Sequence, residues 1–544
     1  MAAVQTALRD RLPNRRKFID GWYADGTYGH QNLAAAMDEG ARLYGDCETI
    51  FHSDTRPGRV TLSALHARSV KLAGALYALG VRQGDVVAVQ LPNWIENVLA
   101  YQAAMQLGAI ILPIVHIYGP KEVSFILRSS GAKVFITPDR WRNIDYLDRL
   151  SRLDIANVEH VVIVGSDIPP GAMSWQQFED RGTDQFPRST AGADDPCLLV
   201  FTSGTTRDPK GVVHSHNSLI AANKMYTELG NMSSRTVTLG AGPAGHIGGV
   251  LNIFKLFLTG SGTIMLDNWN PEDAAQLVEK HKVDQCNGTP YFLSTLLDAA
   301  ERGGADVSSL TRYMVGGASV PASLIVRCDG AGLGACRSYG STEVATVTAS
   351  YIGDPLEKRA NTDGRATPRS HIRIMGDNGE ILPVGEEGEV AILSPQMFLG
   401  YSDPALNAES FTSDGWFLSG DIGKLDADGY LIITDRKKDI IIRGGENISS
   451  KEVEDVLATH PAVFESAVTA MPDSVLGERV CAFVMLRPSQ SLTLDQVRQH
   501  FLAAGIAKPK TPERIVIIEE FPRTAAGKVK KFELRKQLKD VATA

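Results

Sequence analysis

The stretch LLVFTSGTTRDPKGVVHSHNSLI, residues 198–220, determines how the rest of the chain is interpreted. Its apolar run, which ends at Phe201, predicts a buried strand, and we expect a helix to start near Val213. Between them lies a loop of Thr and Ser with Gly204 and Lys210. Hydroxyls, an ammonium group and an unshielded glycine backbone suit a polyphosphate. The loop therefore predicts a phosphate site, with a solvated turn as the alternative.

Short apolar runs alternate with amphipathic stretches on the N-terminal side of this loop. Alternation of this kind is typical of parallel βαβ units whose sheet is covered on both faces. Further along, short strands near residues 372–393, separated by glycine turns, predict a small antiparallel β subdomain. The strands expected before the loop lie near residues 86–91, 109–115, 133–137 and 158–165, with helices near 94–107 and 121–130.

A length of 544 residues is too great for one hydrophobic core, so we expect at least two domains. The composition changes at DRKKDIIIRGGEN, residues 435–447, which is dense in charge and glycine. We therefore expect an α/β fold with a large N-terminal domain of βαβ sheets, residues 1–435, which includes the small β subdomain. A small mobile α+β C-terminal domain, residues 436–544, would follow.

Composition and charge exclude several classes of protein. With 43% hydrophobic and 22% charged residues, the chain is not a disordered one. The net charge is −8 and no basic run occurs, so we expect no nucleic-acid partner. The longest apolar stretches, residues 99–115 and 249–266, are interrupted by polar residues, which predicts no transmembrane segment. Six cysteines without CxxC spacing and no N-terminal signal core favour a cytoplasmic location.

A series of motifs follows the phosphate loop along the chain. They are GPAGHIGGV (242–250), VGGASVP (315–321), YGSTE (339–343), DGWFLSGD (414–421), DRKKD (435–439), GGENIS (444–449) and FPRTAAGKVKK (521–531). With FTSGTTRDPKG before them, their order and spacing resemble the adenylate-forming superfamily of acyl-CoA synthetases, aryl-CoA ligases, luciferases and peptide-synthetase adenylation domains. The resemblance runs from about residue 44 to residue 538. Arg207 and Asp435 depart from it, since glycine is usual at both positions, and a positive φ would cost Arg207 about 1 kcal/mol.

The resemblance implies a set of nucleotide-binding residues. A hard cation that bridges phosphates is well served by carboxylate and hydroxyl oxygens, and the resemblance gives Thr202 and Glu343 as the ligands of Mg²⁺. The residues implied to hold ATP are Thr202, Ser203, Gly204, Thr205, Thr206 and Lys210 for the phosphates, Gly317, Ala318, Tyr339, Gly340, Ser341 and Thr342 for adenine and the α-phosphate, and Asp421 and Arg436 for the ribose.

The remaining motifs are implied to carry the chemistry and the other two substrates. Lys528 would bind the acid's carboxylate and the α-phosphate, acting with Glu343 and Thr202 as the catalytic set. His246, Gly316 and Gly317 would line the acyl site, although His246 is equally well interpreted as a structural histidine. Lys438 would be the hinge of the C-terminal domain, with a solvated lysine as the alternative. Gly444 and Gly445 would line the coenzyme A tunnel, or simply form a turn before a helix.

These implications predict an ATP-dependent acid–thiol ligase that uses ATP, Mg²⁺ and coenzyme A. It would convert a carboxylic acid into an acyl-AMP and then an acyl-CoA; a medium-chain, branched, alicyclic or steroid-derived acid is expected. One alternative is an enzyme that loads a carrier protein, and another is a catalytically dead homologue that binds a ligand. No GxGxxG opens a helix, which excludes a Rossmann dehydrogenase. The oligomeric state stays open, with a homodimer among the options.

Overall fold

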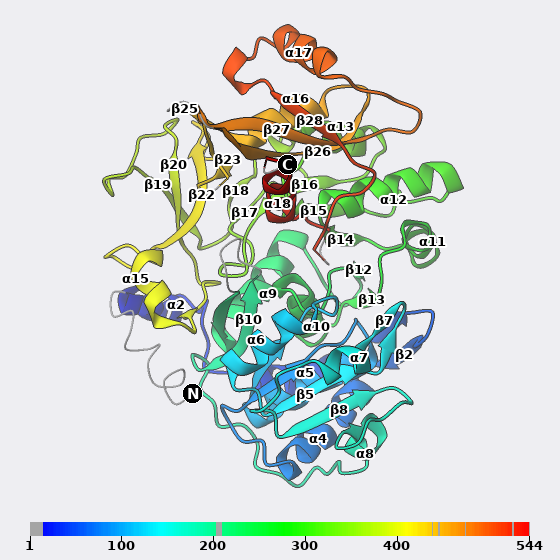
Figure 1. Ribbon diagram of the computed structural model, residues 1–544. Helices are drawn as coiled ribbons and strands as arrows, with labels where there is room; N and C mark the ends of the chain where they lie inside the picture. The colour runs from blue at the N-terminus through cyan, green and yellow to red at the C-terminus, as the bar shows by residue number, and fades with distance from the viewer. Residues whose placement is uncertain are drawn as a thin grey trace.

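The computed structural model describes residues 15–202, 209–437, 439–443, 446–473, 475–524 and 527–542. Two large mixed sheets form the lower and middle parts of the molecule, a small antiparallel sheet lies at one side, and the C-terminal domain lies at the top (Figure 1). Among these residues no helix is long and apolar enough to cross a membrane. The expected α/β fold, with a large N-terminal domain and a small α+β C-terminal domain, is confirmed.

The first large sheet contains the strands predicted before the phosphate loop. Val86–Val89, Ile110–Pro113 and Val134–Pro138 are buried along their whole length, as expected of parallel strands covered on both faces. In order across the sheet the strands are β21 (Gly400–Tyr401), β11 (Lys210–Ser215), β10 (Pro196–Thr202), β4 (Ile110–Pro113), β3 (Val86–Val89), β5 (Val134–Pro138), β8 (His160–Val164) and β9 (Met173–Ser174).

The second large sheet is parallel in its centre and antiparallel at both ends. Its central strands end at the turns that carry VGGAS and YGSTE, so both motifs lie at the carboxyl edge. The strand order is β18 (Arg365–Ala366), β17 (Thr348–Ala349), β16 (Ala335–Tyr339), β15 (Arg312–Gly316), β14 (Gln285–Gly288), β12 (Val237–Gly240), β13 (Gly262–Leu266), β1 (Glu48–His52) and β2 (Gly58–Thr61).

Helices fill the space between the two sheets and cover their outer faces (Figure 1). The largest hydrophobic core joins the sheets through α3, α4, α5 and α10. The helices of the N-terminal domain are α2 (Arg16–Ala24), α3 (Leu33–Tyr44), α4 (Leu62–Ala78), α5 (Ile95–Leu107), α6 (Pro120–Ser130), α7 (Tyr146–Ser151), α8 (Trp175–Glu179), α9 (His216–Gly230), α10 (Ile247–Thr259), α11 (Pro271–His281), α12 (Pro290–Gly303), α13 (Ala322–Gly330), α14 (Leu356–Asn361) and α15 (Asn407–Ser410).

One expectation about the phosphate loop is wrong. The chain forms an antiparallel strand, β11, directly after the loop, and α9 begins at His216 rather than near Val213. The reason is that the β-branched pair Val212–Val213 is buried between β10 and β21, where it pairs with both strands. Ser215 then caps α9 through a capping box with Ser218. The loop therefore closes a hairpin instead of opening a helix.

The small β subdomain and the C-terminal domain have the predicted character. The subdomain is a four-stranded antiparallel sheet, which confirms the strands expected near residues 372–393. The C-terminal domain has its own hydrophobic core. The subdomain contains β19 (His371–Met375), β20 (Gly388–Leu393), β22 (Phe417–Leu425) and β23 (Leu431–Arg436). The C-terminal domain contains β24 (Ile441–Arg443), β25 (Glu446–Ile448), α16 (Ser450–Ala458), β26 (Val463–Asp473), β27 (Gly477–Leu486), α17 (Leu494–Ala503), β28 (Arg514–Ile517) and α18 (Lys531–Ala542).

A buried carboxylate joins the subdomain to the first helix of the C-terminal domain. Asp435, near the end of β23, is 6% exposed. It accepts hydrogen bonds from the backbone N–H of Ser450 at 2.5 Å and from its hydroxyl at 3.2 Å. A negative charge at a helix N-terminus is stabilising. Asp435 therefore stabilises the arrangement in which β23 and α16 are in contact.

Candidate active site

The two strands of the β10–β11 hairpin hold Thr202 and Lys210 opposite each other. They are paired in the ladder, and the Thr202 hydroxyl lies 3.5 Å from the carbonyl oxygen of Lys210. The Lys210 ammonium lies 5.1 Å from the centre of the Tyr401 ring. Both site residues thus lie at the mouth of the loop. The loop residues Ser203, Gly204, Thr205, Thr206 and Arg207 lie outside the described part of the chain.

Tyr401 connects this hairpin to the YGSTE motif. It lies on β21, beside β11, and its hydroxyl donates a hydrogen bond of 2.7 Å to Oε1 of Glu343. Burial, and then the Glu343 charge, raise the pKa of Tyr401, so the phenol stays protonated and remains a donor. One aromatic ring therefore contacts the ammonium of Lys210 and orients the carboxylate of Glu343. No sequence motif marks Tyr401.

His214, on β11, contacts the backbone of the same motif. Its Nε2 lies 2.7 Å from the carbonyl oxygen of Thr342, and its Nδ1 lies 3.1 Å from the Ser218 hydroxyl. Burial lowers the pKa of His214 to about 4, so the ring is neutral near pH 7. A neutral ring can donate only one proton, and a carbonyl can only accept, so Nε2 carries it and Nδ1 accepts from Ser218. His214 thus holds the backbone of Thr342 in place.

The YGSTE turn itself is compact. The Ser341 N–H donates to the Val344 carbonyl at 2.8 Å, and the Val344 N–H donates to the Ser341 hydroxyl at 3.3 Å. A Cβ atom on Gly340 would lie 2.2 Å from the carbonyl oxygen of Ala345, so only glycine fits there. The predicted residues of this motif therefore form one rigid turn at the end of β16.

Tyr339, Asp421 and Arg436 form a hydrogen-bonded group on the side expected for the ribose. The Tyr339 hydroxyl donates to Oδ2 of Asp421 at 2.6 Å, and Nε of Arg436 lies 3.0 Å from Oδ1. The Asp421 side chain is 7% exposed, whereas that of Arg436 is 48% exposed. The Asp421 charge raises the pKa of Arg436, and burial raises that of Tyr339. Each carboxylate oxygen keeps further acceptor capacity, which suits a pair of ribose hydroxyls.

The VGGAS turn lies directly against Lys528, which comes from the C-terminal domain. Gly317 has a φ of +77°, and a Cβ atom there would lie 3.3 Å from Cε and 3.9 Å from Nζ of Lys528. Gly316 is the last residue of β15 and lies against Ser338 at the end of β16. Ala318 follows on the exposed side of the turn. Residues that are more than 200 positions apart in the chain are therefore brought together.

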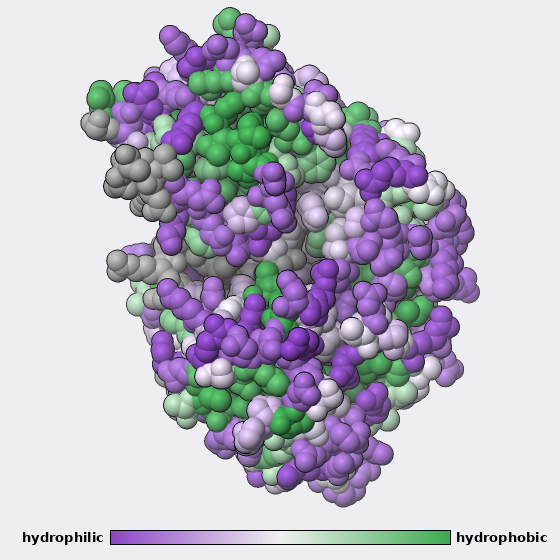
Figure 2. Space-filling view, turned by 45° about the vertical axis from the view of Figure 1, so that its right-hand side comes forward, coloured by the Kyte–Doolittle hydropathy of each residue, from purple (hydrophilic) through white to green (hydrophobic). Residues whose placement is uncertain are grey.

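The hairpin that presents Lys528 is fixed by Arg523. The backbone of Arg523 bridges to Val529, and its Nη1 donates to the Gly527 carbonyl at 2.9 Å. Its guanidinium pairs with Glu465 on β26 and lies 4.7 Å from the centre of the Tyr291 ring in α12. The cation–π contact attaches the hairpin to the large domain. Figure 2 shows this side of the molecule hollowed where the upper, C-terminal part meets the rest.

His246 precedes α10 and lies within the electrostatic reach of Lys528. Burial, and then the positive charge of Lys528, lower the pKa of His246 to about 4. Its Nε2 is buried without a hydrogen-bond partner in the described part of the chain. His116, which packs edge-on against Trp141, interacts electrostatically with it. His246 is thus a neutral ring near Lys528, and its predicted place in the lining of the acyl site stays a prediction.

The donors of the predicted nucleotide site suit a magnesium ion that is held mainly by phosphate. Thr202 supplies a hydroxyl and Glu343 a carboxylate, and Mg²⁺ in nucleotide sites typically takes one or two carboxylates plus phosphate oxygens. Among the described residues no group of three or more His, Cys, Asp and Glu could hold a metal ion. The predicted hinge Lys438 and the coenzyme A residues Gly444 and Gly445 lie outside the described ranges.

Comparison with known proteins agrees with this geometry. Residues 38–402 match the AMP-binding enzyme family, and residues 452–528 match the AMP-binding enzyme C-terminal domain. The chain belongs to the AMP-binding enzymes. The resemblance to the adenylate-forming superfamily is thereby confirmed, with the AMP-forming acyl-CoA synthetase as its enzyme class and ATP and coenzyme A as the co-substrates of that class.

Three relatives illustrate how far the similarity of this AMP-binding enzyme extends. The medium-chain fatty-acid–CoA ligase of Escherichia coli (strain K12) is 36% identical over 519 residues, which cover 94% of this chain and 91% of the relative. The 2-hydroxy-7-methoxy-5-methyl-1-naphthoate–CoA ligase of Streptomyces carzinostaticus is 31% identical, with 94% of each chain covered. The crystal structure of ATP-bound MatB from Rhodopseudomonas palustris matches with a TM-score of 0.82 at 26% identity, over 94% of this chain and 100% of that one.

Proposed function

We propose that this AMP-binding enzyme activates a carboxylic acid on the VGGAS turn, with Lys528 as the catalytic cation, and passes the acyl group to coenzyme A. The single observation that carries the proposal is the contact between Lys528 and Gly317, where a Cβ atom would lie 3.3 Å from the lysine Cε. This contact brings an ammonium group from the C-terminal domain to the place where acid and nucleotide would meet.

The chemistry needs charge neutralisation more than covalent participation by the protein. A carboxylate is a poor acyl donor, because its leaving group would be oxide. Attack of a carboxylate oxygen on the α-phosphorus of ATP forms a C–O–P linkage and expels pyrophosphate, leaving an acyl-AMP. Negative charge gathers between the two reactants as they approach. The Lys528 ammonium would neutralise it, and preorganised charges of this kind are usually the largest single contribution to catalysis.

The other residues would position the nucleotide. Asp421 would accept hydrogen bonds from the ribose hydroxyls, with Tyr339 and Arg436 holding its carboxylate in place. Thr202 and Glu343 would hold Mg²⁺, which supplies positive charge to the phosphates when bound. The hydrogen bond from Tyr401 would keep the Glu343 carboxylate oriented toward Mg²⁺. Their contribution is orientation, which is worth several kcal/mol when two reactants must meet in line.

Transfer to coenzyme A completes the proposed reaction. The thiolate sulfur attacks the acyl carbon of the acyl-AMP, and AMP leaves with the bonding electrons. We propose that rotation about Lys438 removes Lys528 and brings Gly444 and Gly445 to the site, as the family resemblance implies. For the acid we propose a medium-chain or ring-containing carboxylic acid; the similarity to the medium-chain and naphthoate ligases supports this choice.

The test is acid-dependent release of pyrophosphate and AMP from MgATP, with and without coenzyme A, over a panel of acids. We expect Lys528→Ala to lower the rate by about 10²-fold or more, as removal of a charge-stabilising donor does in other enzymes. Lys530→Ala is the matched control, because Lys530 lies two residues away and pairs with Glu533 at 2.9 Å. It should keep the wild-type rate.

The outcomes separate the proposal from its alternatives. Acid-dependent AMP release that coenzyme A accelerates, and that Lys528→Ala abolishes, supports the ligase. Pyrophosphate release without acceleration by coenzyme A indicates a carrier-protein acceptor instead. A Lys528→Ala variant with wild-type rates overturns the assignment of the catalytic cation. A lack of turnover with every acid favours the catalytically dead homologue.

A further inference from the structure

A cavity lies between α9, α10 and the central strands of the second large sheet. The space in it that the centre of a water-sized sphere can reach is about 30 Å³, and all the space between its protein atoms, open solvent included, is about 490 Å³. No Asp or Glu occurs in its lining, although two cationic residues do. The lining residues are Asn223, Tyr226, Met232, Thr238, Leu239, Gly248, Leu251, Asn252, Lys255, Gln285, Cys286, Asn287, Arg312 and Met314.

Three residues that line this cavity lie two positions along the chain from residues near the VGGAS turn and the Lys528 hairpin. Gly248 lies two residues after His246, Met314 two residues before Gly316, and Asn287 two residues before Thr289, which is near Gly527. Two residues along a strand span about 7 Å. The cavity therefore begins next to the reacting centre and extends backward along the strands.

The other end is polar. Thr238, Gln285 and Arg312 lie at or near the amino ends of their strands, remote from the VGGAS turn. Lys255 lies nine residues after His246, which is about 13 Å along α10. A chain of medium length or a fused ring system would span this distance. An acyl group that enters from the reacting end would thus bring its far end to Lys255.

Lys255 is buried there without an anion. Its side chain is 8% exposed, and its Nζ contacts the Thr238 hydroxyl at 3.1 Å and the Asn252 Oδ1 at 3.3 Å. In the part of the chain that the structure describes, no carboxylate forms an ion pair with it. An ammonium group has three donors, so one is left for a third acceptor. Burial lowers the pKa of Lys255 to about 8, which leaves it mostly protonated at pH 7.

Two neighbours in the lining also have unused donors. Asn252 is 6% exposed and Arg312 is 7% exposed. The Nδ2 of Asn252, and the Nε and Nη2 of Arg312, have no hydrogen-bond partner among the described residues. Buried donors without partners are costly, since each loses its hydrogen bonds to water. A ligand oxygen at this end of the cavity would offset that cost.

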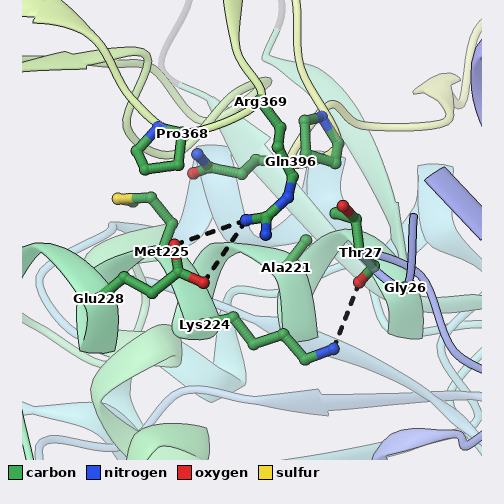
Figure 3. Close-up of a pocket in the computed structure, with 10 residues that line it drawn as sticks. Gly26, Thr27, Ala221, Lys224, Met225, Glu228, Pro368, Arg369 and Gln396 are labelled. Carbon is green, nitrogen blue, oxygen red and sulfur yellow. Dashed lines mark hydrogen bonds and ion pairs between the residues drawn. The ribbon is translucent and has the colours of Figure 1, made fainter.

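A second cavity serves as a comparison, because its lining contains both an acid and cations. It lies on another face of α9, where Glu228 and Arg369 approach to 3.5 Å and Lys224 donates to the Thr27 carbonyl at 3.3 Å (Figure 3). Its carboxylate, Glu228, pairs with Arg369, and Lys224 donates to a backbone carbonyl. The cavity at Lys255 differs because its lining supplies cations and donors without an acid.

We infer that the cavity between α9 and α10 holds the acyl group and that Lys255 binds an acceptor oxygen at the end remote from the reacting carboxylate. The inference rests on the proposed function. The substrate class is thus a carboxylic acid with a distal ketone or second carboxylate. A site built to hydrogen-bond a substrate oxygen rejects an analogue that lacks it far more strongly than an apolar site rejects a missing methylene.

The test compares kcat/KM for octanoate, 7-oxooctanoate and octanedioate with the full chain. We expect at least one oxygenated acid to be preferred over octanoate by about tenfold or more. Lys255→Met should lower that ratio about tenfold. Lys224→Met, which removes a lysine from the other cavity, should leave the ratio at its wild-type value. A preference for 7-oxooctanoate identifies a carbonyl, and one for octanedioate identifies a carboxylate; either supports the inference.

A second variant guards against misfolding of the first. Asn252→Asp is nearly isosteric and places a carboxylate beside Lys255, so it should reduce the relative kcat/KM for octanedioate by repulsion. A ratio near one in the wild type, or a ratio that neither variant changes, overturns the inference. In that case octanoate turnover that needs Lys528 would leave the proposed function intact. A lack of turnover with all three acids would instead refute the function itself.

Discussion

Adding one methyl group at Gly317 tests whether the VGGAS turn positions Lys528. In Gly317→Ala the new Cβ would lie 3.3 Å from the lysine Cε, against about 3.7 Å for an ordinary carbon–carbon contact. The lysine must then retreat by about 0.4 Å. Since a 1 Å misplacement in an active site can cost about 10²-fold, we expect adenylation to slow by about sixfold.

The assay must separate this effect from backbone strain. Alanine at a positive φ costs about 1 kcal/mol wherever it occurs. Gly332→Ala is the matched control, because Gly332 has a φ of +72° and nothing within 4 Å of the added Cβ. Both variants should lose similar stability in chemical denaturation. Only Gly317→Ala should slow acid-dependent pyrophosphate release.

A double variant identifies the atom through which the methyl acts. If the effect passes through Lys528, Gly317→Ala should add nothing to the loss already caused by Lys528→Ala, because the displaced group is gone. Equal slowing in Gly317→Ala and Gly332→Ala would refute the reasoning. So would a further loss in the double variant, since the methyl would then act on the acid or the nucleotide directly.

Two predictions concern stability. Asp363→Ala should destabilise the fold by about 3–5 kcal/mol in chemical denaturation, because it leaves the buried guanidinium of Arg337, 2.7 Å away, unpaired. Asp306→Ala, at an exposed pair, should destabilise it far less, and equal losses would contradict this. Between pH 7 and 5.5 histidines take up protons in the unfolded state, whereas the buried neutral histidines of the folded state do not. The free energy of unfolding should therefore fall by about 1.2 kcal/mol for each such histidine, and a pH-independent denaturation midpoint would contradict this. These histidines are His116, His214, His216 and His246, with pKa values lowered by burial to about 3, 4, 4 and 4.

The strands of the N-terminal domain were predictable because burial on both faces leaves continuous apolar runs. The strand after the phosphate loop was not, since a short run such as Val212–Val213 fits a strand or a helix equally well until its pairing partners are known. Its partner β21 lies near residue 400, which local pattern cannot reveal. The hairpin thus depends on a contact between distant segments.

The same limit applies to the site. The motifs marked Tyr339, Asp421 and Lys528, and the structure brings the first two together at 2.6 Å. Tyr401 and His214 were missed because each acts on YGSTE from another strand, and neither stands in a recognisable pattern. In the sequence, Lys255 is only one of the polar residues that interrupt the apolar stretch 249–266. Its proposed role depends on the absence of a carboxylate among the residues around it in the cavity, and only the fold shows which residues those are.

The contact between Asp435 and Ser450 bears on what limits the speed of the enzyme. Rotation about Lys438 would have to separate this buried carboxylate from the start of α16 in every cycle. Opening of this kind sets the overall rate in many enzymes. Where it is the slowest step here, acids of very different reactivity would share one turnover number. The acids would then differ only in kcat/KM, which measures the rate at low acid concentration.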